Sequence, residues 1–332
     1  MSNSLPATMK AAAIVATADR PTLEIVDVPV PAPGEGQMLV RVRASGLNRA
    51  DLRRTQAHFR VEGPVIAGLE VAGDVVATGA GVSAFAPGDR IAAMAPGGYA
   101  EFALADEAAT FGIPDSIGYV EAAALPVWYQ TAHDALATAG RLEAGQSVLV
   151  TAAASGIGIA AAQCARVLGA APIVGSVRPG PRPPAFRALQ WDAVVGASPD
   201  DLKAGVLEAT GGRGADVVVD MVGAGILDAL LEATALGGRI VSVGRLGGFH
   251  DTVDMDKLAL RRISLVGVTF RTRDREQKRA VRDAMLRDLM PAIDAGRLRP
   301  VVDSSFPFAD VLAAQQKMAE NRHFGKIVLT TD

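Results

Sequence analysis

A run of small residues between an apolar strand and a helix has the composition of a ligand-binding turn. Residues 148–158 read VLVTAAASGIG, and Ala153, Ser155 and Gly158 take the three spaced positions of a dinucleotide fingerprint. Small side chains there let the backbone approach a pyrophosphate, and the amides at the start of the helix face that anion. The alternative is a tight strand–helix turn without a ligand. As a cofactor site, the turn would use Ala154, Ser155, Gly156, Ile157 and Gly158.

The segments that follow this turn have the order of a doubly wound sheet. Beyond residue 147, continuous Val, Ile and Leu runs alternate with stretches of helical spacing, the pattern of a parallel sheet buried on both faces. Six strands with helical crossovers predict a Rossmann fold, and this context favours cofactor binding at the turn. The predicted strands are 147–151, 171–177, 192–196, 216–221, 239–244 and 263–269.

The rest of the chain is predicted to form a small, mostly β domain. Short β-forming runs split by Gly and Pro turns precede residue 120, and a last strand is expected at 326–329. We expect the C-terminal tail to return to this first domain. The prediction is therefore an α/β protein, with a mostly β domain over 1–124 and 288–332 and a six-stranded dinucleotide-binding domain over 125–287.

The residues after the second predicted strand indicate which dinucleotide binds. An NAD site expects an Asp or Glu there to bind the ribose 2′-hydroxyl. Residues 173–182 read IVGSVRPGPR and contain no acid, and the first acidic residue beyond the turn is Asp192. Ser176, Arg178 and Arg182 supply a hydroxyl and two guanidinium groups, which suit a 2′-phosphate. The sequence thus favours NADPH, with arginines that merely solvate a loop as the alternative.

Composition and charge exclude several classes of protein. The chain has 332 residues, of which 49% are hydrophobic, and a net charge of −3, so we expect sizeable cores and no strong attraction to nucleic acid or acidic membranes. The single cysteine, Cys164, excludes an intramolecular disulfide. No apolar run approaches the roughly 20 residues of a membrane span. The N-terminus lacks the pattern of a signal peptide. We therefore expect a soluble, cytoplasmic protein that acts on a small molecule.

Short segments spread nearly end to end carry a family resemblance. They are Met9-Lys-Ala, Ala44-Ser-Gly-Leu-Asn-Arg-Ala-Asp51, Gly68-Leu-Glu-Val-Ala-Gly73, Pro87-Gly-Asp-Arg90, Gly97-Gly-Tyr-Ala-Glu101, Ala122-Ala-Ala-Leu-Pro126, Ala152–Gly158, Gly238-Arg-Ile-Val241 and Gly325-Lys-Ile-Val-Leu329. In these segments the chain resembles the medium-chain dehydrogenase/reductase superfamily, in its quinone oxidoreductase (zeta-crystallin-like) branch. The resemblance implies a GroES-like fold for the mostly β domain, which would bind the substrate.

The zinc-binding members of that superfamily carry metal ligands that this chain lacks. They place a cysteine near Ser45, a Gly-His-Glu where Gly68-Leu69-Glu70 stands, and four cysteines for a structural ion. Leu69 cannot bind a metal, and the four histidines are dispersed without ligand spacing. We therefore expect no metal. Because no Lewis acid would polarise a simple alcohol or aldehyde, the resemblance implies hydride transfer to an activated acceptor, a quinone or an enone.

The resemblance also implies roles for residues of the first domain. Asn48 would be the catalytic residue, which donates a hydrogen bond to the acceptor oxygen and contacts the cofactor. Its alternative role is that of a turn residue. Asp51 lies in the same substrate-facing segment, and we favour a structural role for it, paired with a nearby arginine. Phe59 stands where relatives often have tyrosine, so we expect the proton to come from solvent. Lys326 either reaches the cofactor or lies in solvent.

Further expected contacts lie in the second domain. Thr131 matches a threonine at the nicotinamide end of the cofactor, with helix packing as the alternative. Trp128 and Tyr129 either line the acceptor pocket or pack at the domain hinge. The remaining cofactor contacts are expected at the carboxyl ends of later strands, where open α/β sheets bind ligands. They are Val222, Gly223, Val243, Gly244, Arg245, Phe270 and Arg271.

Three functions stay open at this point. The leading one is NADPH-dependent reduction of a quinone or enone. The second is reduction of the double bond of an enoyl thioester, for which Arg53, Arg54 and Arg60 would form a basic entrance. The third is a non-catalytic NADPH-binding protein. In each case the apolar sixth strand, 263–270, would be an exposed sheet edge, and this predicts a homodimer that covers it.

Overall fold

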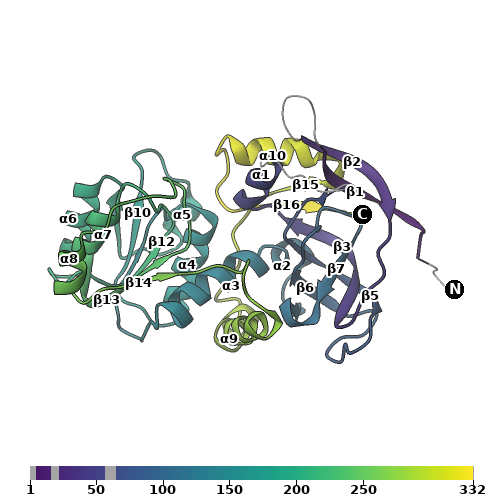
Figure 1. Cartoon of the computed structure of the whole chain (residues 1–332), viewed down its shortest axis with the longest axis horizontal. Coiled ribbons are helices and arrows are strands. Elements are labelled where there is room, and N and C mark those ends of the chain that lie inside the picture. The colour runs from purple at the N-terminus through teal and green to yellow at the C-terminus, as the bar shows by residue number, and fades with distance from the viewer. Residues whose placement is uncertain (1–4, 16–21, 57–64, 332) are drawn as a thin grey trace. The chain divides into compact units, whose positions relative to one another are not determined.

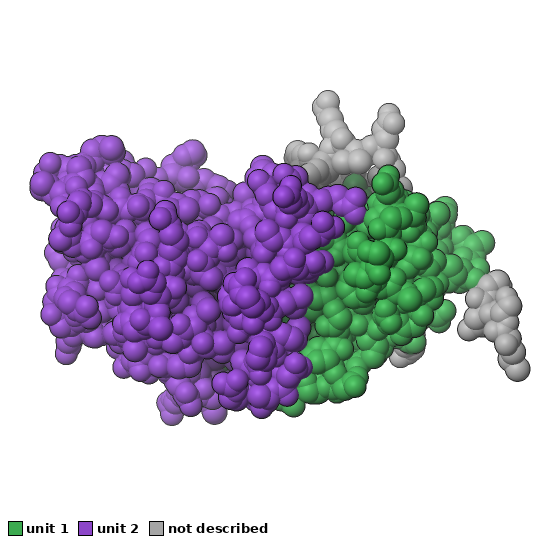
Figure 2. All heavy atoms as spheres, turned by 90° about the horizontal axis from the view of Figure 1, so that it is seen from below, with its two compact units in different colours: residues 1–127, 299–332 green, residues 128–298 purple. Residues whose placement is uncertain are grey.

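The computed structural model describes residues 5–15, 22–56 and 65–331. The chain forms two compact units (Figures 1 and 2). One contains residues 1–127 and 299–332, and the other contains residues 128–298. Each unit is described separately below.

The unit of residues 128–298 is built on one parallel sheet. Its six strands lie in the order β11-β10-β9-β12-β13-β14, and every adjacent pair is parallel. This is the 3-2-1-4-5-6 order of a Rossmann fold, which confirms the predicted fold class. The strands are β9 (Val148–Val150), β10 (Ile173–Val177), β11 (Ala193–Gly196), β12 (Ala215–Asp220), β13 (Thr234–Ser242) and β14 (Ser264–Gly267).

Helices alternate with these strands, as the crossovers of a parallel sheet require. Leu149, Val218 and Ile240 come from three adjacent strands and are fully buried, so the core lies along the central strands. The long helix α9 confirms the helix predicted at 276–295. It packs against α4, so the domain boundary predicted after residue 287 falls inside α9. The helices are α3 (Pro126–His133), the π-helical η2 (Asp134–Ala139), α4 (Gly156–Val167), α5 (Pro184–Arg187), α6 (Pro199–Ala209), α7 (Leu227–Ala233), α8 (Met255–Leu260) and α9 (Arg275–Asp294).

The other unit is mostly β, as predicted, and contains two sheets. The smaller has the order β2-β1-β4, and the larger has the order β15-β16-β3-β5-β6-β8 with β7 paired to β3. The last strand, β16, lies between β15 and β3, so the C-terminal tail does return to this unit. The strands are β1 (Thr8–Val15), β2 (Thr22–Pro29), β3 (Gln37–Gly46), β4 (Val65–Ile66), β5 (Glu70–Thr78), β6 (Arg90–Met94), β7 (Phe102–Asp106), β8 (Thr110–Gly112), β15 (Val302–Pro307) and β16 (Lys326–Thr330).

Short helices connect some of these strands along the chain. Helix α1 directly follows β3 and begins at Arg49, so it carries Asp51 and presents the residues just before it. The other helices are η1 (Glu107–Ala109), α2 (Tyr119–Ala122), η3 (Phe308–Asp310) and α10 (Val311–Ala319), and α1 spans Arg49–Gln56. Within the described ranges, none of the helices has both the length and the apolar composition that crossing a bilayer would demand.

Candidate functional site

The predicted cofactor turn joins β9 to α4 in the geometry of an anion site. Ser155 caps α4, and its Oγ accepts a hydrogen bond from the Gly158 amide at 3.2 Å. Gly156 and Ile157 are the first two residues of the helix, so their amides have no acceptor within it. Ala154 is exposed beside them. Open amides, a small exposed side chain and the positive end of the helix dipole fit a dinucleotide pyrophosphate.

Two glycines of this turn are required by the close approach of other groups. A Cβ on Gly158 would lie 2.7 Å from the carbonyl oxygen of Ala152. A Cβ on Gly156 would clash with the indole ring of Trp128, which is only 6% exposed. Trp128 therefore supports the cofactor turn from α3. Sequence reasoning missed this role, because no pattern in the chain connects an aromatic residue before the turn to a glycine within it.

Tyr129 and Thr131, two further residues of α3 that were predicted to contact a ligand, differ in how far they are buried. Tyr129 is fully buried, its hydroxyl donates to Oε1 of Gln163 on α4, and burial raises its pKa. A buried ring with a satisfied hydroxyl is a packing residue. This geometry favours packing over the acceptor pocket for Tyr129. Thr131 is partly buried on the same helix, and its contact with the nicotinamide stays a prediction.

The three residues expected to bind a 2′-phosphate have different surroundings. Ser176 is 1% exposed, and its hydroxyl donates to the carbonyl oxygen of Gly196 at 3.2 Å, so its predicted role is not favoured. Arg178 is exposed, with its side chain open to solvent. The Arg182 guanidinium lies 5.8 Å from the centre of the Phe186 ring and donates to the main-chain oxygen of Arg178. The two arginines thus share one loop after β10, as an anion site would need.

A buried carboxylate that the sequence did not single out joins three strands of the sheet. Asp220 ends β12 and is 2% exposed. Its Oδ1 accepts from the Thr151 hydroxyl after β9, at 2.8 Å. Its two oxygens accept from the amides of Val222 and Gly223. Burial raises the pKa of this carboxyl, and these hydrogen bonds oppose the shift.

The main chain of Asp220 completes this arrangement. Its carbonyl oxygen accepts from the amides of Val243 and Gly244 after β13. The four predicted strand-end residues 222, 223, 243 and 244 therefore converge on one group, but their amides already have protein acceptors. Any contact that they make with a cofactor comes from their side chains, carbonyls or Cα atoms. Sequence reasoning missed Asp220 because it looks like the last polar residue of an apolar strand.

The remaining predicted contacts of this unit lie on its surface. Arg245 and Arg271 are exposed, and Phe270 is partly buried. The Arg273 guanidinium lies 5.1 Å from the centre of the Phe270 ring and pairs with the buried Asp134 at 2.7 Å. Phe270 is thereby held in place next to the end of β14, whereas the two exposed arginines stay predictions.

In the other unit, Asn48 and Lys326 meet in a buried ionic cluster. Lys326 and Glu70 are fully buried and form an ion pair. The Lys326 ammonium also donates to Oδ1 of Asn48 at 2.9 Å, and Nδ2 of Asn48 donates to Oε1 of Glu70 at 2.8 Å. Burial lowers the pKa of Lys326, and the Glu70 carboxylate opposes that shift. The expectation that Lys326 lies in solvent is wrong, because the side chain ends inside this cluster, whereas its contact with the cofactor stays a prediction.

Asp51 is attached to the same cluster. Its Oδ2 accepts from the Tyr99 hydroxyl at 2.7 Å and from the Asn48 amide at 2.9 Å. Burial raises the pKa of Asp51 to about 6, while these hydrogen bonds and the Lys326 charge oppose the shift. The bond to the Asn48 amide caps the start of α1, which supports the structural role expected for Asp51.

The remaining predicted features of the two units have a simple outcome. Phe59 lies outside the described residues, and so does the side-chain entrance predicted from Arg53, Arg54 and Arg60. The part of the chain that the structure describes holds no group of three His, Cys, Asp or Glu side chains that could bind a metal. Cys164 is buried on α4, and burial raises the pKa of its thiol.

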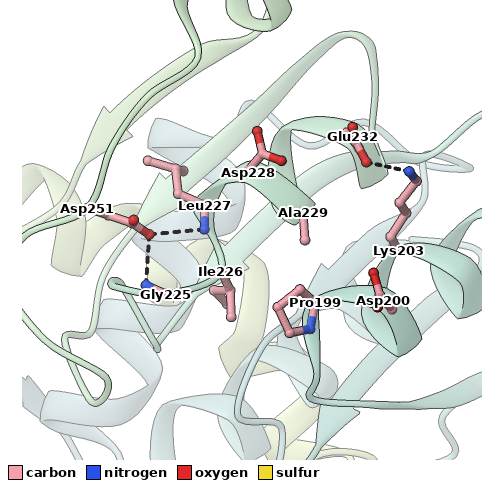
Figure 3. Close-up of a pocket in the computed structure, with 10 residues that line it drawn as sticks. All are labelled: Pro199, Asp200, Lys203, Gly225, Ile226, Leu227, Asp228, Ala229, Glu232 and Asp251. Carbon is pink, nitrogen blue, oxygen red and sulfur yellow. Dashed lines mark hydrogen bonds and ion pairs between the residues drawn. The ribbon is translucent and has the colours of Figure 1, made fainter.

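A small cavity in the unit of residues 128–298 is lined by residues of α6, α7 and the segments before α7 and α8, and by none of the glycine-rich turn (Figure 3). Its volume is about 190 Å³, below the roughly 300 Å³ at which ligand pockets begin. Asp251 at its rim accepts from the amides of Gly225 and Leu227, and Lys203 pairs with Glu232 (Figure 3). These polar groups satisfy one another, so the cavity contributes no chemistry to the candidate site.

Comparison with known proteins places this geometry in a family. Residues 34–115 match the profile of the alcohol dehydrogenase GroES-like domain. Residues 189–329 match the profile named zinc-binding dehydrogenase. The quinone oxidoreductase of Lama guanicoe is 32% identical over 313 residues, which cover 91% of each chain. The chain belongs to the medium-chain dehydrogenase/reductase superfamily, and within it to the zinc-independent quinone oxidoreductase branch.

Two further similarities bear on the chemistry. A mycobacterial protein solved in complex with NADPH is 29% identical, with a TM-score of 0.85, and the similarity covers 97% of this chain and all of that one. The spectinabilin polyketide synthase system protein NorB of Streptomyces orinoci is 35% identical over 303 residues. That match covers 89% of this chain but 13% of the synthase protein. The chain is thus an oxidoreductase of the type that uses a nicotinamide dinucleotide.

Proposed function

We propose that this protein is a cytoplasmic reductase that uses NADPH to reduce a quinone or an α,β-unsaturated carbonyl compound. The observation that carries the proposal is a dinucleotide turn on a Rossmann sheet, combined with Ser45 and Leu69 at the positions where zinc relatives have metal ligands. Ser45 donates its hydroxyl to the carbonyl oxygen of Gly98, and Leu69 cannot bind a metal. An acceptor that needs no Lewis acid fits such a site.

The protein's own residues would bind and orient the reactants. NADPH supplies a hydride, and the reduced acceptor takes up one proton as well. The open amides of Gly156 and Ile157 would hold the pyrophosphate, and the loop with Arg178 and Arg182 would hold the 2′-phosphate. Asn48 would stabilise negative charge on the acceptor oxygen by donating a hydrogen bond from its side-chain amide. The described residues offer no phenolic donor next to it, because the Tyr99 hydroxyl donates to Asp51.

The direct test is NADPH oxidation by the purified protein with a benzoquinone and with a 2-alkenal, followed by the loss of absorbance of the reduced nicotinamide. We expect turnover with at least one acceptor, and no change on adding a chelator. If NADPH binds but neither acceptor is reduced, the proposal fails, and a non-catalytic NADPH-binding protein becomes the better interpretation.

The second prediction concerns the choice between NADPH and NADH. Replacing Arg178 and Arg182 by alanine should weaken NADPH binding by about tenfold to a hundredfold per arginine and leave NADH binding unchanged, since a hydrogen bond to a charged group contributes roughly 1.5–3 kcal/mol. Titrations of both cofactors against intrinsic fluorescence measure the two affinities. Arg187→Ala, an exposed arginine on the neighbouring α5, is the matched control and should change neither. Equal affinities of the unmutated protein for both cofactors would sink the prediction.

A second candidate function is the reduction of enoyl thioesters. It is favoured by the similarity to part of a polyketide synthase system protein, although that match covers 13% of the larger protein. The same assay with a 2-enoyl thioester tests it. Turnover of the thioester at least tenfold faster than of the benzoquinone and the alkenal would make this the preferred function.

The third prediction is a homodimer formed through the edge of the Rossmann sheet. In the described structure β14 pairs with β13 on one side and forms the end of the sheet. Leu265 on β14 is 45% exposed, so an apolar side chain is left open at this edge. Light scattering at micromolar concentration should give a dimer, and Leu265→Lys should give monomers. Leu312→Lys on α10, at a similarly exposed leucine, should remain dimeric. A monomeric unmutated protein would contradict the prediction.

A further inference from the structure

The ion pair of Lys326 and Glu70 is an unusual electrostatic feature of the described residues. Both side chains are fully buried, and burying charge is costly unless each group finds partners. The pair lies between the ends of β16, β5 and β3. The backbone makes room for it, because a Cβ on Gly46 would clash with Cε of Lys326 and lie 2.5 Å from the carbonyl oxygen of Ala123. Glycine is therefore required at position 46 for the pair to fit.

The pair holds the side-chain amide of Asn48 at both ends. The Lys326 ammonium donates to Oδ1, and the Glu70 carboxylate accepts from Nδ2. An amide turned by 180° would place oxygen against oxygen and N–H against ammonium, so only one orientation is allowed. The Glu70 carboxylate is itself fixed, because its other oxygen accepts from the Val127 amide at 2.7 Å.

One hydrogen of the Asn48 amide remains weakly bound. Nδ2 carries two hydrogens, and the one not directed at Glu70 faces the carbonyl oxygen of Gly46 at 3.4 Å. That distance is longer than the 2.7–3.2 Å of a normal N–H···O bond. Asn48 keeps 5% of its surface exposed, whereas Lys326 and Glu70 keep none. The weakly bound hydrogen is therefore the one that a ligand oxygen can take.

We propose that Lys326 and Glu70 are positioning residues that orient the Asn48 amide so that its weakly bound N–H, and not its carbonyl, can bind the acceptor oxygen. The inference rests on the proposed reductase function and deepens it. In this role the ion pair acts on the acceptor through Asn48, whose two amide ends it contacts. It determines which end of the amide is presented, and hence whether the site stabilises negative charge.

Exchanging the two charges tests this directly. In the double variant Lys326→Glu/Glu70→Lys the ion pair is kept but its polarity is reversed, so the Asn48 amide turns over and presents its carbonyl. We expect the rate constant kcat with benzoquinone to fall by about a hundredfold, the effect of losing one oxyanion donor, while the Kd of NADPH stays unchanged. A double variant with unchanged kcat would overturn the proposal, because an ion pair of either polarity would then be sufficient.

A second measurement covers the case in which the double variant does not fold. In protein labelled with 15N-asparagine, the Asn48 side-chain amide is identified by the signals that vanish in Asn48→Ala. Adding NADP⁺ and a hydroquinone should shift one of its two hydrogens, and Glu70→Gln should abolish that selective shift. Equal responses of both hydrogens in the unmutated protein would contradict a fixed amide.

A control variant and the two measurements distinguish failure of the positioning role from failure of the proposed function. Lys317→Met removes a different ion pair of the same unit, the partly buried pair with Asp303, and should leave kcat unchanged. If the unmutated protein reduces no acceptor, the proposed function fails while the NMR measurement still tests the orientation of Asn48. If it does reduce an acceptor and the charge exchange has no effect, the function stands and the positioning role is wrong.

Discussion

Replacing Lys326 by methionine is expected to lower the free energy of unfolding by about 3–5 kcal/mol, the usual cost of leaving one partner of a buried ion pair uncompensated. Methionine fills nearly the same volume as lysine, so little of the loss would come from a cavity. The Glu70 carboxylate would stay fully buried with the amides of Asn48 and Val127 but without a cation. Amides offset only part of that desolvation.

Thermal and denaturant unfolding, followed by circular dichroism, measure this loss. The midpoint temperature of the unfolding transition that involves the β unit should fall by on the order of 10 °C. The control is Lys10→Met, which breaks a pair with Asp27 whose side chains are 53% and 61% exposed, and which should cost at most about 1 kcal/mol. If Lys326→Met loses no more free energy of unfolding than the control does, then water or a neighbouring group compensates the buried charge of Glu70.

The Rossmann unit could be predicted because its information is local in the sequence. Each buried strand is a continuous apolar run, and the glycine-rich turn sits between a strand and a helix, so the order of elements follows from the chain itself. The turn residues Ser155 to Gly158 lie where the sequence places them, at the start of α4. The β unit was predicted more coarsely, since short strands split by turns specify neither pairing nor sheet order.

The surroundings of the predicted site residues could not be derived in the same way. Lys326 was expected in solvent or near the cofactor, because nothing near it in the sequence indicates that it is buried. Its partner Asn48 lies 278 positions away, and the two meet only because β16 pairs with β3. The contacts of Trp128 with Gly156 and of Asp220 with Thr151 were missed for the same reason, since they depend on groups brought together by the fold. Long-range polar contacts of this kind have no periodic pattern in a single sequence.

Asn48→Ala is the prediction with the largest expected effect on the reaction. If the weakly bound Asn48 hydrogen stabilises the acceptor oxygen as it gains charge, its loss should raise the activation barrier by roughly 2–4 kcal/mol, as for other oxyanion donors. The effect should appear in kcat more than in the Kd of NADPH, because the bond strengthens only in the transition state. Rates with a benzoquinone and a 2-alkenal, together with NADPH titrations, make this comparison.

The substitution also removes a partner of Lys326 and of Glu70, so a loss of stability must be separated from a loss of catalysis. Rates are therefore measured well below the unfolding transition of the variant, and the fraction of folded protein is determined from its circular dichroism. Gln315→Ala, which truncates another buried amide of the same unit on α10, is the matched control and should keep the unmutated rate. If folded Asn48→Ala reduces both acceptors as fast as the unmutated protein, then Asn48 serves only to join the buried ion pair to α1, and charge on the acceptor must be stabilised by another group.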